Sequence, residues 1–423
     1  MDSLTQSILL ELLNFSTSQN QKLFVVGGTL RDFLSRKPCS DFDLTGKNAA
    51  ELGTGFARSL NFTCVPLDKT PGRRTARVIL DQKQHLDFTD LQGKNIEEDL
   101  SQRDFTINAM GLLLTDFLSG RKSIIDPHKG QEDLNNKKIR VLPGPIISSD
   151  PLRMLRAFRF AATLGFEIDE DTLNEISLHR AKLIETAPER IWHELTLFFK
   201  TKNTLALLKT MHGCGLLDSF LPIQGEAFAQ YQRLELLLKN PSETFPECAD
   251  QFTTRDFLDQ QYLLRFSVLK MNQSPNITQN LRSSNVETQF INQAIDGARR
   301  LNEMCLMGNQ ELNEIYELTT KIHEELLASV ILFITASDAE DRSSFCNLIL
   351  KFYYDQFLPA INKKPLLNGE DIIHQFQLSP SPLFGNILNR VQKAQVLGDI
   401  ATREDAIALA EDIVQSQTKE SNE

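Results

Sequence analysis

The sequence lacks a long hydrophobic run, a zinc-type cysteine pair and a signal peptide. Its longest apolar run, residues 326–336, has about half the length that a helix needs to span a membrane. The six cysteines form no CxxC pair, which argues against a zinc site or a disulfide framework and favours reduced thiols. The N-terminus lacks the basic and then apolar pattern of a secretory signal. We therefore expect a soluble, cytoplasmic protein with no membrane partner.

An excess of basic residues is also missing. The formal net charge is −11, so the chain as a whole does not attract nucleic acid, and such a partner would need local basic patches. Basic residues do gather in three short stretches: Arg73, Arg74 and Arg77; Lys137, Lys138 and Arg140; Arg153, Arg156 and Arg159. Each stretch is equally consistent with an ordinary solvated face.

The first part of the chain differs in pattern from the rest. Strand-like stretches occur only before residue 142, at 23–26, 42–44, 62–66, 75–80, 85–89 and 124–126. From Asp150 onward the apolar spacing is helical. Because 423 residues are too many for one ordinary core, we expect an α+β portion followed by a long all-helical portion.

A glycine pair and an arginine follow the first predicted strand, in the stretch LFVVGGTLRD. Gly27 and Gly28 allow a tight turn and a close approach of the backbone to a ligand. Residues 29–36 have helical spacing and place Arg31 near the helix start, where phosphate binding is favourable. These three residues are therefore candidates for binding a nucleotide's phosphates.

Two aspartates lie one residue apart on the next predicted strand. Side chains alternate along a strand, so Asp41 and Asp43 should share a face while Phe42 points to the core. A divalent cation relieves the repulsion between two such carboxylates, and two ions can clamp the attacking and leaving oxygens of a phosphoryl transfer. Asp87, on the predicted strand 85–89, is a candidate third carboxylate. A DxD or a GG alone is common in turns and strand ends, but their order here is more specific.

A second motif, RDFTINA, begins at residue 103. Arg103 can meet a triphosphate, and Asp104 can accept a hydrogen bond from a ribose 2′-hydroxyl. Asn108 can hold a loop or touch a phosphate. Taken alone, the motif is also consistent with a helix start capped by Asp104. The turn at residues 126–134 that follows is interpreted as a hinge.

A third motif, SDPLRMLRAFRFAA, begins at residue 149. Asp150 and Arg153 are three residues apart and should share a helix face, where they can present a donor and an acceptor to a nucleobase edge. A local ion pair between them is the simpler alternative. Arg156, one turn further on, is a further candidate for nucleotide binding. In the later segment PERIWHEL, the single tryptophan, Trp192, is more consistent with a core position than with a stacking platform.

The order GGTLRD, DFD, RDFTINA, SDPLRMLRAFRFAA and PERIWHEL resembles that of the bacterial (class II) tRNA nucleotidyltransferase and poly(A) polymerase family. The resemblance covers residues 20–210 and resumes near the C-terminus, at residues 367–372, 379–385 and 393–408. It implies a polymerase-β-like nucleotidyltransferase head, with a mixed sheet and helices, and an all-helical remainder. The implied segments are a catalytic head (1–142), a neck that recognises the base (143–210), a body (211–335) and a tail that binds tRNA (336–423).

The resemblance also implies an activity, the addition of CMP, AMP or both to the 3′ end of tRNA without a nucleic-acid template. Mg²⁺ ions on Asp41 and Asp43 would activate the 3′-hydroxyl and hold the triphosphate. The glycine pair, Arg31 and Arg103 would bind phosphates. Asp104 would read the ribose, and Asp150 with Arg153 would pair with the base of CTP or ATP.

Two departures from the family pattern bear on which nucleotide is added. Ser149 stands where the family usually has Glu, which affects the orientation of Arg153. The connection at residues 91–98 is shorter than the flexible segment of members that complete CCA, and a short connection resembles the CC-adding subtype. We therefore expect CC addition. Full CCA addition, A addition and poly(A) synthesis are the alternatives, and an inactive RNA-binding protein is disfavoured because both aspartates are present.

Overall fold

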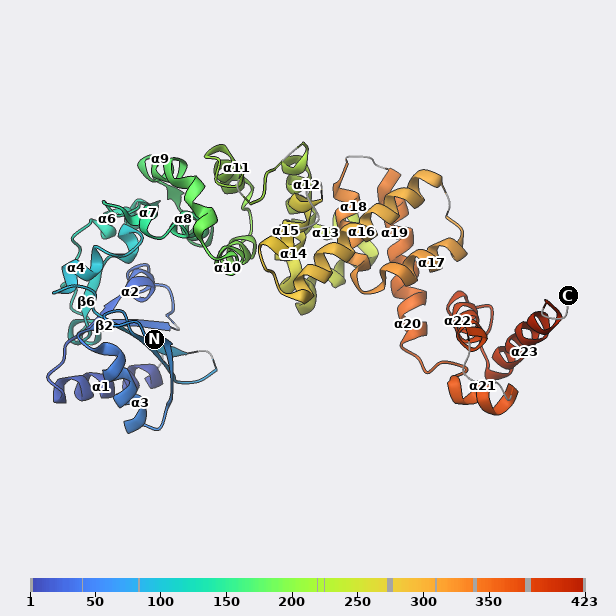
Figure 1. Ribbon diagram of the computed structural model, residues 1–423, viewed down its shortest axis with the longest axis horizontal. Coiled ribbons are helices and arrows are strands. Elements are labelled where there is room, and N and C mark those ends of the chain that lie inside the picture. Colours follow the sequence, from blue (N-terminus) through green and yellow to red (C-terminus); the bar gives the residue numbers. More distant parts are fainter. Residues whose placement is uncertain are drawn as a thin grey trace. The chain divides into compact units, whose positions relative to one another are not determined.

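The computed structural model describes residues 3–39, 41–82, 84–218, 220–223, 225–271, 277–308, 310–337, 341–376 and 382–420. The chain forms two compact units, Met1–Pro222 and Ile223–Glu423 (Figure 1). The finer division into four segments stays a prediction. Among the helices described, none combines the length and the apolar content that crossing a membrane requires.

The first unit is built on a mixed six-stranded sheet. Its strands follow the order β3-β4-β5-β2-β1-β6, and only β2 and β5 are parallel neighbours. The strands are β1 (Leu23–Val26), β2 (Asp41–Gly46), β3 (Thr63–Asp68), β4 (Thr75–Ile79), β5 (His85–Asp90) and β6 (Gly111–Leu113). Five of the six predicted strands are therefore present, with no end shifted by more than two residues.

The sixth predicted strand, residues 124–126, is wrong. Ile125 forms only an isolated bridge to Gly111, and the edge strand is β6, which the sequence pattern missed. Asp126 instead accepts hydrogen bonds from the backbone amides of Gly130 (2.6 Å) and Gln131 (2.9 Å). It thus satisfies amides at the start of helix α6 (Gly130–Asn135), and Pro127 after it has no amide to donate to a strand ladder.

One face of this sheet carries the core, and the alternation along the strands decides which residues lie there. Phe42 and Leu44 of β2 and Leu86 and Phe88 of β5 are 0–1% exposed. They pack with apolar residues of α1 (Ser3–Ser18), α2 (Gly27–Leu34), α3 (Ala49–Ser59) and α5 (Leu114–Ser119). Figure 1 shows α1 and α3 side by side against the strands. The intervening residues, including both predicted metal-binding aspartates, point to the opposite face.

The rest of the first unit is mostly helical. Two short strands, β7 (Lys138–Ile139) and β8 (Glu167–Ile168), pair in parallel, which corrects the expectation of helices alone after residue 150. The remaining helices are α4 (Ile96–Leu100), a 3₁₀ turn at Thr106–Asn108, α6 (Gly130–Asn135), α7 (Ile146–Ser149), α8 (Arg153–Leu164), α9 (Glu170–His179), a 3₁₀ helix at Arg180–Glu185, α10 (Pro188–Phe199) and α11 (Leu205–Gly213). Trp192 is 7% exposed within α10, as expected for a core residue.

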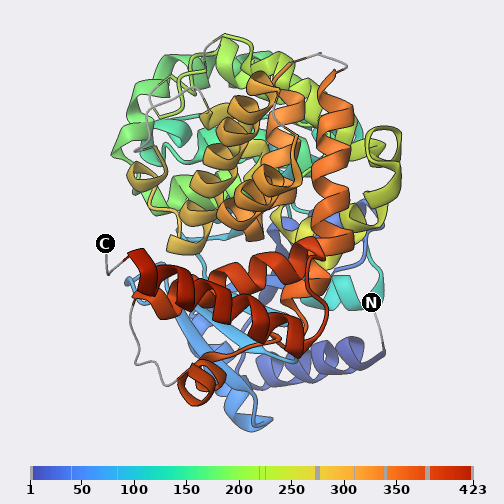
Figure 2. The same cartoon turned by 90° about the vertical axis from the view of Figure 1, so that its right-hand side faces the viewer.

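The second unit is helical throughout its described residues. It contains α12 (Ala227–Lys239), α13 (Pro241–Thr244), α14 (Arg255–Lys270), α15 (Ile277–Asn280), α16 (Asn285–Met307), α17 (Leu312–Ile322), α18 (Leu326–Thr335), α19 (Asp341–Phe352), α20 (Leu358–Ile361), α21 (Gly369–Phe376), α22 (Pro382–Leu397) and α23 (Arg403–Glu420). The longest apolar run of the sequence forms α18, a buried helix. The last three helices share a separate core cluster and lie together in dark red and orange in Figure 2. Of the predicted tail motif, residues 379–381 lie outside the described residues.

Candidate active site

The polar face of the sheet brings the three predicted carboxylates together. Asp43 of β2 pairs with Asp87 of β5 in the parallel ladder, and Asp41 pairs with His85. Because paired residues on neighbouring strands share a face, the three carboxylates and His85 lie on the side opposite the core. His85 Nδ1 is 3.0 Å from Asp41 Oδ1, and its Nε2 is 3.7 Å from Asp87 Oδ2.

The glycine pair closes over the Asp43 carboxylate. Helix α2 begins at Gly27 itself, and the backbone amide of Gly28 donates to Asp43 Oδ2 at 3.0 Å. Gly27 has a φ of +61°, and a Cβ there would lie 2.9 Å from the same oxygen. The positive φ and the close approach therefore both require glycine at this position.

The Asp43 carboxylate is affected by its burial. Burial raises its pKa, and the nearby charge of Asp87 adds to the rise, while Arg103 and the amide of Gly28 offset only part of it. An ionised Asp43 is thus held at a cost that a bound cation would relieve. Within the described residues no group of three or more His, Cys, Asp or Glu side chains is placed to hold a metal ion. The donor set does fit Mg²⁺, which needs only one or two carboxylates when substrate phosphates supply further oxygens.

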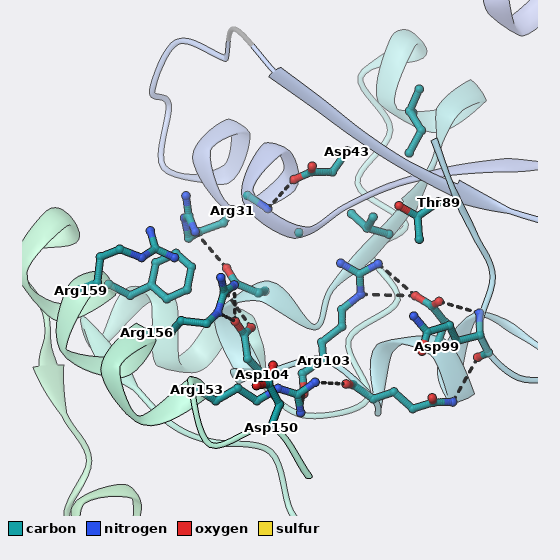
Figure 3. A pocket seen from close by; sticks show the side chains of 18 of the residues that line it. Arg31, Asp43, Thr89, Asp99, Arg103, Asp104, Asp150, Arg153, Arg156 and Arg159 are labelled. Atoms are coloured by element: carbon teal, nitrogen blue, oxygen red, sulfur yellow. Dashed lines mark hydrogen bonds and ion pairs between the residues drawn. The ribbon is translucent and has the colours of Figure 1, made fainter. Parts of the chain in front are cut away.

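A pocket of about 520 Å³ opens beside Asp43 within the first unit (Figure 3). Its lining has six arginines and four aspartates and no lysine, so it is positively charged in a chain whose net charge is −11. Ten of the twelve predicted site residues line it: Gly27, Gly28, Arg31, Asp43, Arg103, Asp104, Asn108, Asp150, Arg153 and Arg156. Asp41 and Asp87 do not line it, since they lie on the sheet face next to it.

Buried hydrogen bonds join the glycine-arginine motif to RDFTINA. Arg31 donates to the Asp32 carboxylate through Nε (2.9 Å) and Nη2 (3.0 Å), and its Nη1 donates to Asn108 Oδ1 at 2.9 Å. The Asn108 amide in turn donates to Asp104 Oδ1 at 3.0 Å. Asn108 therefore connects a predicted phosphate-binding arginine to the predicted ribose-reading aspartate. Arg103 is anchored on Asp99 by Nε and Nη2, and its Nη1 lies near Gly27.

Asp104 is held from a second direction by the α8 helix. Its Oδ2 accepts from Arg156 Nε (3.0 Å) and Nη2 (2.7 Å), and Oδ1 also accepts from the Phe105 amide. Burial alone would raise the pKa of Asp104, but the charge of Arg156 and these hydrogen bonds outweigh it and lower the pKa below its usual value. Asp104 is therefore an ionised, buried anchor.

Several pocket residues were not among the predicted site residues, and Arg159, Phe160 and Arg190 are three of them. Glu194 of α10 is 4% exposed, and it accepts from Arg159 Nε at 2.6 Å and from Arg156 Nη1 at 3.4 Å. Phe160 lines the pocket, with the Arg159 guanidinium 3.9 Å from its ring centre. Arg190 also lines the pocket. Arginine and glutamate at helical spacing gave a weak signal, but their pairing between two helices is not readable from one segment.

The expectation that Asp150 and Arg153 share a helix face is wrong. Helix α8 begins at Arg153, and Asp150 before it is extended, with φ −142° and ψ 93°. Asp150 pairs with Arg190 instead, at 3.2 Å. Arg153 donates to the backbone carbonyls of Gln102 (3.0 Å), Ile146 (3.3 Å) and Arg103 (3.4 Å). Both side chains still line the pocket (Figure 3).

Ser149 offers a hydroxyl and no carboxylate beside Arg153. It is the last residue of α7, and its hydroxyl donates to the Ile146 carbonyl at 3.0 Å. The same carbonyl accepts from Arg153. Arg153 is therefore held by backbone oxygens, which neutralise less of its charge than a carboxylate would.

Comparison with known proteins covers most of the chain. Residues 23–140 match the Poly A polymerase head domain, residues 165–228 match a region described as an RNA- and SrmB-binding site of polymerase A, and residues 259–410 match domain 2 of tRNA nucleotidyltransferases.

Individual relatives are similar over nearly their whole length. A CC-adding tRNA nucleotidyltransferase of Synechocystis sp. is 25% identical over 93% of this chain and 94% of its own length. An A-adding tRNA nucleotidyltransferase of Deinococcus radiodurans is 26% identical, with 92% and 94% covered. The fold is that of the Thermotoga maritima CCA-adding enzyme solved with tRNA, with a TM-score of 0.72, 23% identity and 99% and 96% of the chains covered.

Proposed function

Because this chain belongs to the tRNA nucleotidyltransferase and poly(A) polymerase family, we propose that it adds the two CMP residues of the terminal CCA to the 3′ end of tRNA, with CTP as donor and no template. The relatives do not separate CC addition from A addition, since members of both kinds are about equally similar to it. The choice of CC addition therefore rests on the chain's own residues.

The observation that carries this choice is the connection between β5 and α4. It comprises only residues 91–95, and hydrogen bonds hold it at several positions. The Gln92 amide donates to Asp99 Oδ1 at 2.9 Å, the Lys94 amide donates to Glu98 Oε2 at 2.8 Å, and Asn95 caps α4. A segment so short and so held has little freedom to rearrange the pocket between one nucleotide and the next.

The carboxylate face would carry the chemistry. Asp41 and Asp43 would hold Mg²⁺, which when bound activates the attacking 3′-hydroxyl and neutralises the triphosphate. The Gly28 amide orients the Asp43 carboxylate. Arg103, held on Asp99, has one free edge for the phosphates, and the arginine-rich pocket wall favours an anionic substrate. Asp87, the third candidate catalytic carboxylate of this face, would contribute its negative charge beside the ions without being one of their ligands.

The opposite wall of the pocket would select the nucleotide. Asp104 would accept from the ribose 2′-hydroxyl through whatever acceptor capacity Arg156 and Asn108 leave free. Asp150 and Arg153 would present an acceptor and a donor to the base edge, each oriented by its own partner and not by the other. Phosphate contacts of the tRNA would make binding sensitive to salt.

The test is a product analysis. A tRNA transcript that lacks its 3′-terminal CCA is incubated with Mg²⁺ and with CTP, ATP or both, and the 3′ ends are sequenced. We expect CC in both reactions that contain CTP, no terminal A, and no product after EDTA treatment until Mg²⁺ is restored. A terminal A would identify a CCA-adding enzyme. Extension only of a transcript that already ends in CC would identify A addition, and long A tails a poly(A) polymerase.

A further inference from the structure

Arg77 lies on the carboxylate face of the sheet but outside the pocket, and the activity proposed above gives it no task. It pairs with Asp87 in the β4–β5 ladder, and Asp87 pairs with Asp43 in the β5–β2 ladder. Arg77 Nε is 2.8 Å from Asp87 Oδ1, and its Nη2 is 2.8 Å from Oδ2. Both oxygens of Asp87 are thus engaged by one planar guanidinium, the strongest geometry for such a pair.

We propose that Arg77 is a positioning residue that keeps the Asp87 carboxylate turned toward β4, so that only Asp41 and Asp43 offer carboxylate oxygens to the metal ions. This inference rests on the proposed function. Mg²⁺ has a strict octahedral shell, and the substrate's phosphate and hydroxyl oxygens need positions in it. A third carboxylate that swung into the shell would occupy one of those positions and would hold the ion more tightly.

The charges on this face support the same role. The hydrogen bonds that Arg77 donates to Asp87, and the charges of Asp87, Asp41 and Asp43, together raise the pKa of Arg77 against the effect of its burial. Among the described arginines, Arg77 is the one that faces these carboxylates from a neighbouring strand, β4. His85 contacts Asp41 and Asp87 from within β5. Without Arg77, Asp87 would keep only this weaker contact and would be free to turn toward Asp43.

A matched control exists beside the same two strands, since Arg74 directly precedes β4 and Asp90 ends β5. Arg74 Nε is 2.7 Å from Asp90 Oδ2, and the exposures of the four side chains are comparable, with 40% and 7% for Arg74 and Asp90 against 37% and 18% for Arg77 and Asp87. Asp90 is three residues further along β5 and faces away from the carboxylates. Arg74→Met therefore removes the same kind of ion pair without touching the proposed metal site.

The experiment compares full-length wild type, Arg77→Met, Arg77→Lys and Arg74→Met. Mn²⁺ binding is followed by electron paramagnetic resonance without nucleotide or RNA, and kcat and KM for CMP incorporation are measured separately. In Arg77→Met we expect Mn²⁺ to bind at least about threefold more tightly, because ligand charge sets affinity. We also expect kcat to fall about 10- to 100-fold, with KM values for CTP and tRNA within about threefold of wild type. Arg77→Lys should recover part of kcat, and Arg74→Met should match wild type in Mn²⁺ affinity.

Simple structural damage would weaken metal binding and slow turnover together. Tighter metal binding combined with slower turnover is therefore not explained by such damage. Wild-type Mn²⁺ affinity in Arg77→Met would overturn the inference. A raised KM for tRNA with unchanged kcat would overturn it too, because Arg77 would then contact the RNA. A wild-type protein that incorporates no CMP would reject the proposed function instead, and the Mn²⁺ comparison would still decide the role of Arg77.

Discussion

Arg156 donates two hydrogen bonds to one oxygen of Asp104, from Nη2 at 2.7 Å and from Nε at 3.0 Å, across 52 residues of sequence. Asp104 lies in the connection between β5 and β6, and Arg156 lies on α8. Asn108 extends the contact to Arg31 of α2. One buried carboxylate therefore joins the element that carries the glycine pair to the helix that lines the opposite wall of the pocket.

The first prediction concerns this pair. Arg156→Met leaves the Asp104 charge, whose side chain is 8% exposed, without its main partner, and breaking a buried pair costs about 3 kcal/mol. Urea unfolding followed by Trp192 fluorescence measures the loss. Trp192 is the only tryptophan and is buried in the first unit, so the signal reports on that unit. Arg156→Lys keeps the positive charge but loses the planar guanidinium, so its free energy of unfolding should lie between those of wild type and Arg156→Met. An unchanged midpoint in Arg156→Met would contradict the assignment of Asp104 as an ionised anchor.

The second prediction is a pH dependence. The pKa of Asp104 is lowered in the folded state, so its ionised form stabilises the fold above the unfolded pKa of about 3.9. That stability is lost as pH falls through the lower folded value. The difference in unfolding free energy between wild type and Asp104→Asn should be largest at neutral pH and should shrink below about pH 4. The same Trp192 measurement, made at several pH values, checks it. A difference that stays constant with pH would show that Asp104 contributes through shape and not through charge.

The third prediction separates function from stability at Asp43. The pKa of Asp43 is raised in the folded protein, so its ionisation destabilises the fold. The free energy of unfolding therefore falls as the pH rises from the unfolded-state pKa through the folded-state pKa. Asp43→Asn should therefore melt at a higher temperature than wild type at pH 7 without divalent cations. Because several kcal/mol of charge stabilisation are lost, incorporation should fall by at least about 10²-fold, with tRNA binding intact. The Asn oxygen can still accept from the Gly28 amide.

Asp41→Asn is the control for that variant. The Asp41 side chain is 53% exposed, and exposed ion pairs contribute little to stability. We therefore expect Asp41→Asn to change the melting temperature less than Asp43→Asn does. Activity should be lost in both variants. Loss of tRNA binding in both would count against a role confined to the metal ions.

The fourth prediction concerns base choice. Arg153 is oriented by three backbone carbonyls, so Arg153→Ala removes a donor from the pocket while leaving the arginines near the phosphates in place. Discrimination of CTP against UTP should relax about tenfold, the effect of roughly 1.4 kcal/mol, with a smaller change in KM for the triphosphate. Competition assays with mixed triphosphates measure it. Unchanged discrimination would remove Arg153 from base reading.

Arg190→Ala tests the partner of Asp150. It should disorient Asp150 by removing the 3.2 Å contact and should relax base choice in the same assay, although less than Arg153→Ala. If Arg190→Ala weakens triphosphate binding instead, Arg190 contacts phosphate and Asp150 is oriented by other groups.

The strand, glycine turn and second strand around Asp41 and Asp43 were predictable because each depends on residues close in sequence. A four-residue apolar run, two glycines and a strict alternation around Phe42 carry their own geometry. The edge strand β6 was missed because Gly111–Leu113 is too short for a periodic signal and exists only by pairing with β1. The shared face assumed for Asp150 and Arg153 failed because residues 151–152 form a turn and α8 begins only at Arg153, which the Asp-Pro start signal does not reveal.

The sequence alone pointed to ten of the residues that line the pocket and predicted an anionic substrate for them. Motif order and strand alternation are properties of the sequence itself, and they can be recognised without knowledge of the fold. Only the tertiary structure decided which charge pairs with which: Asp87 with Arg77, Asp104 with Arg156, Asp150 with Arg190 and Glu194 with Arg159. Those choices depend on the register between strands and on the packing of helices far apart in the chain, where small shifts exchange one partner for another.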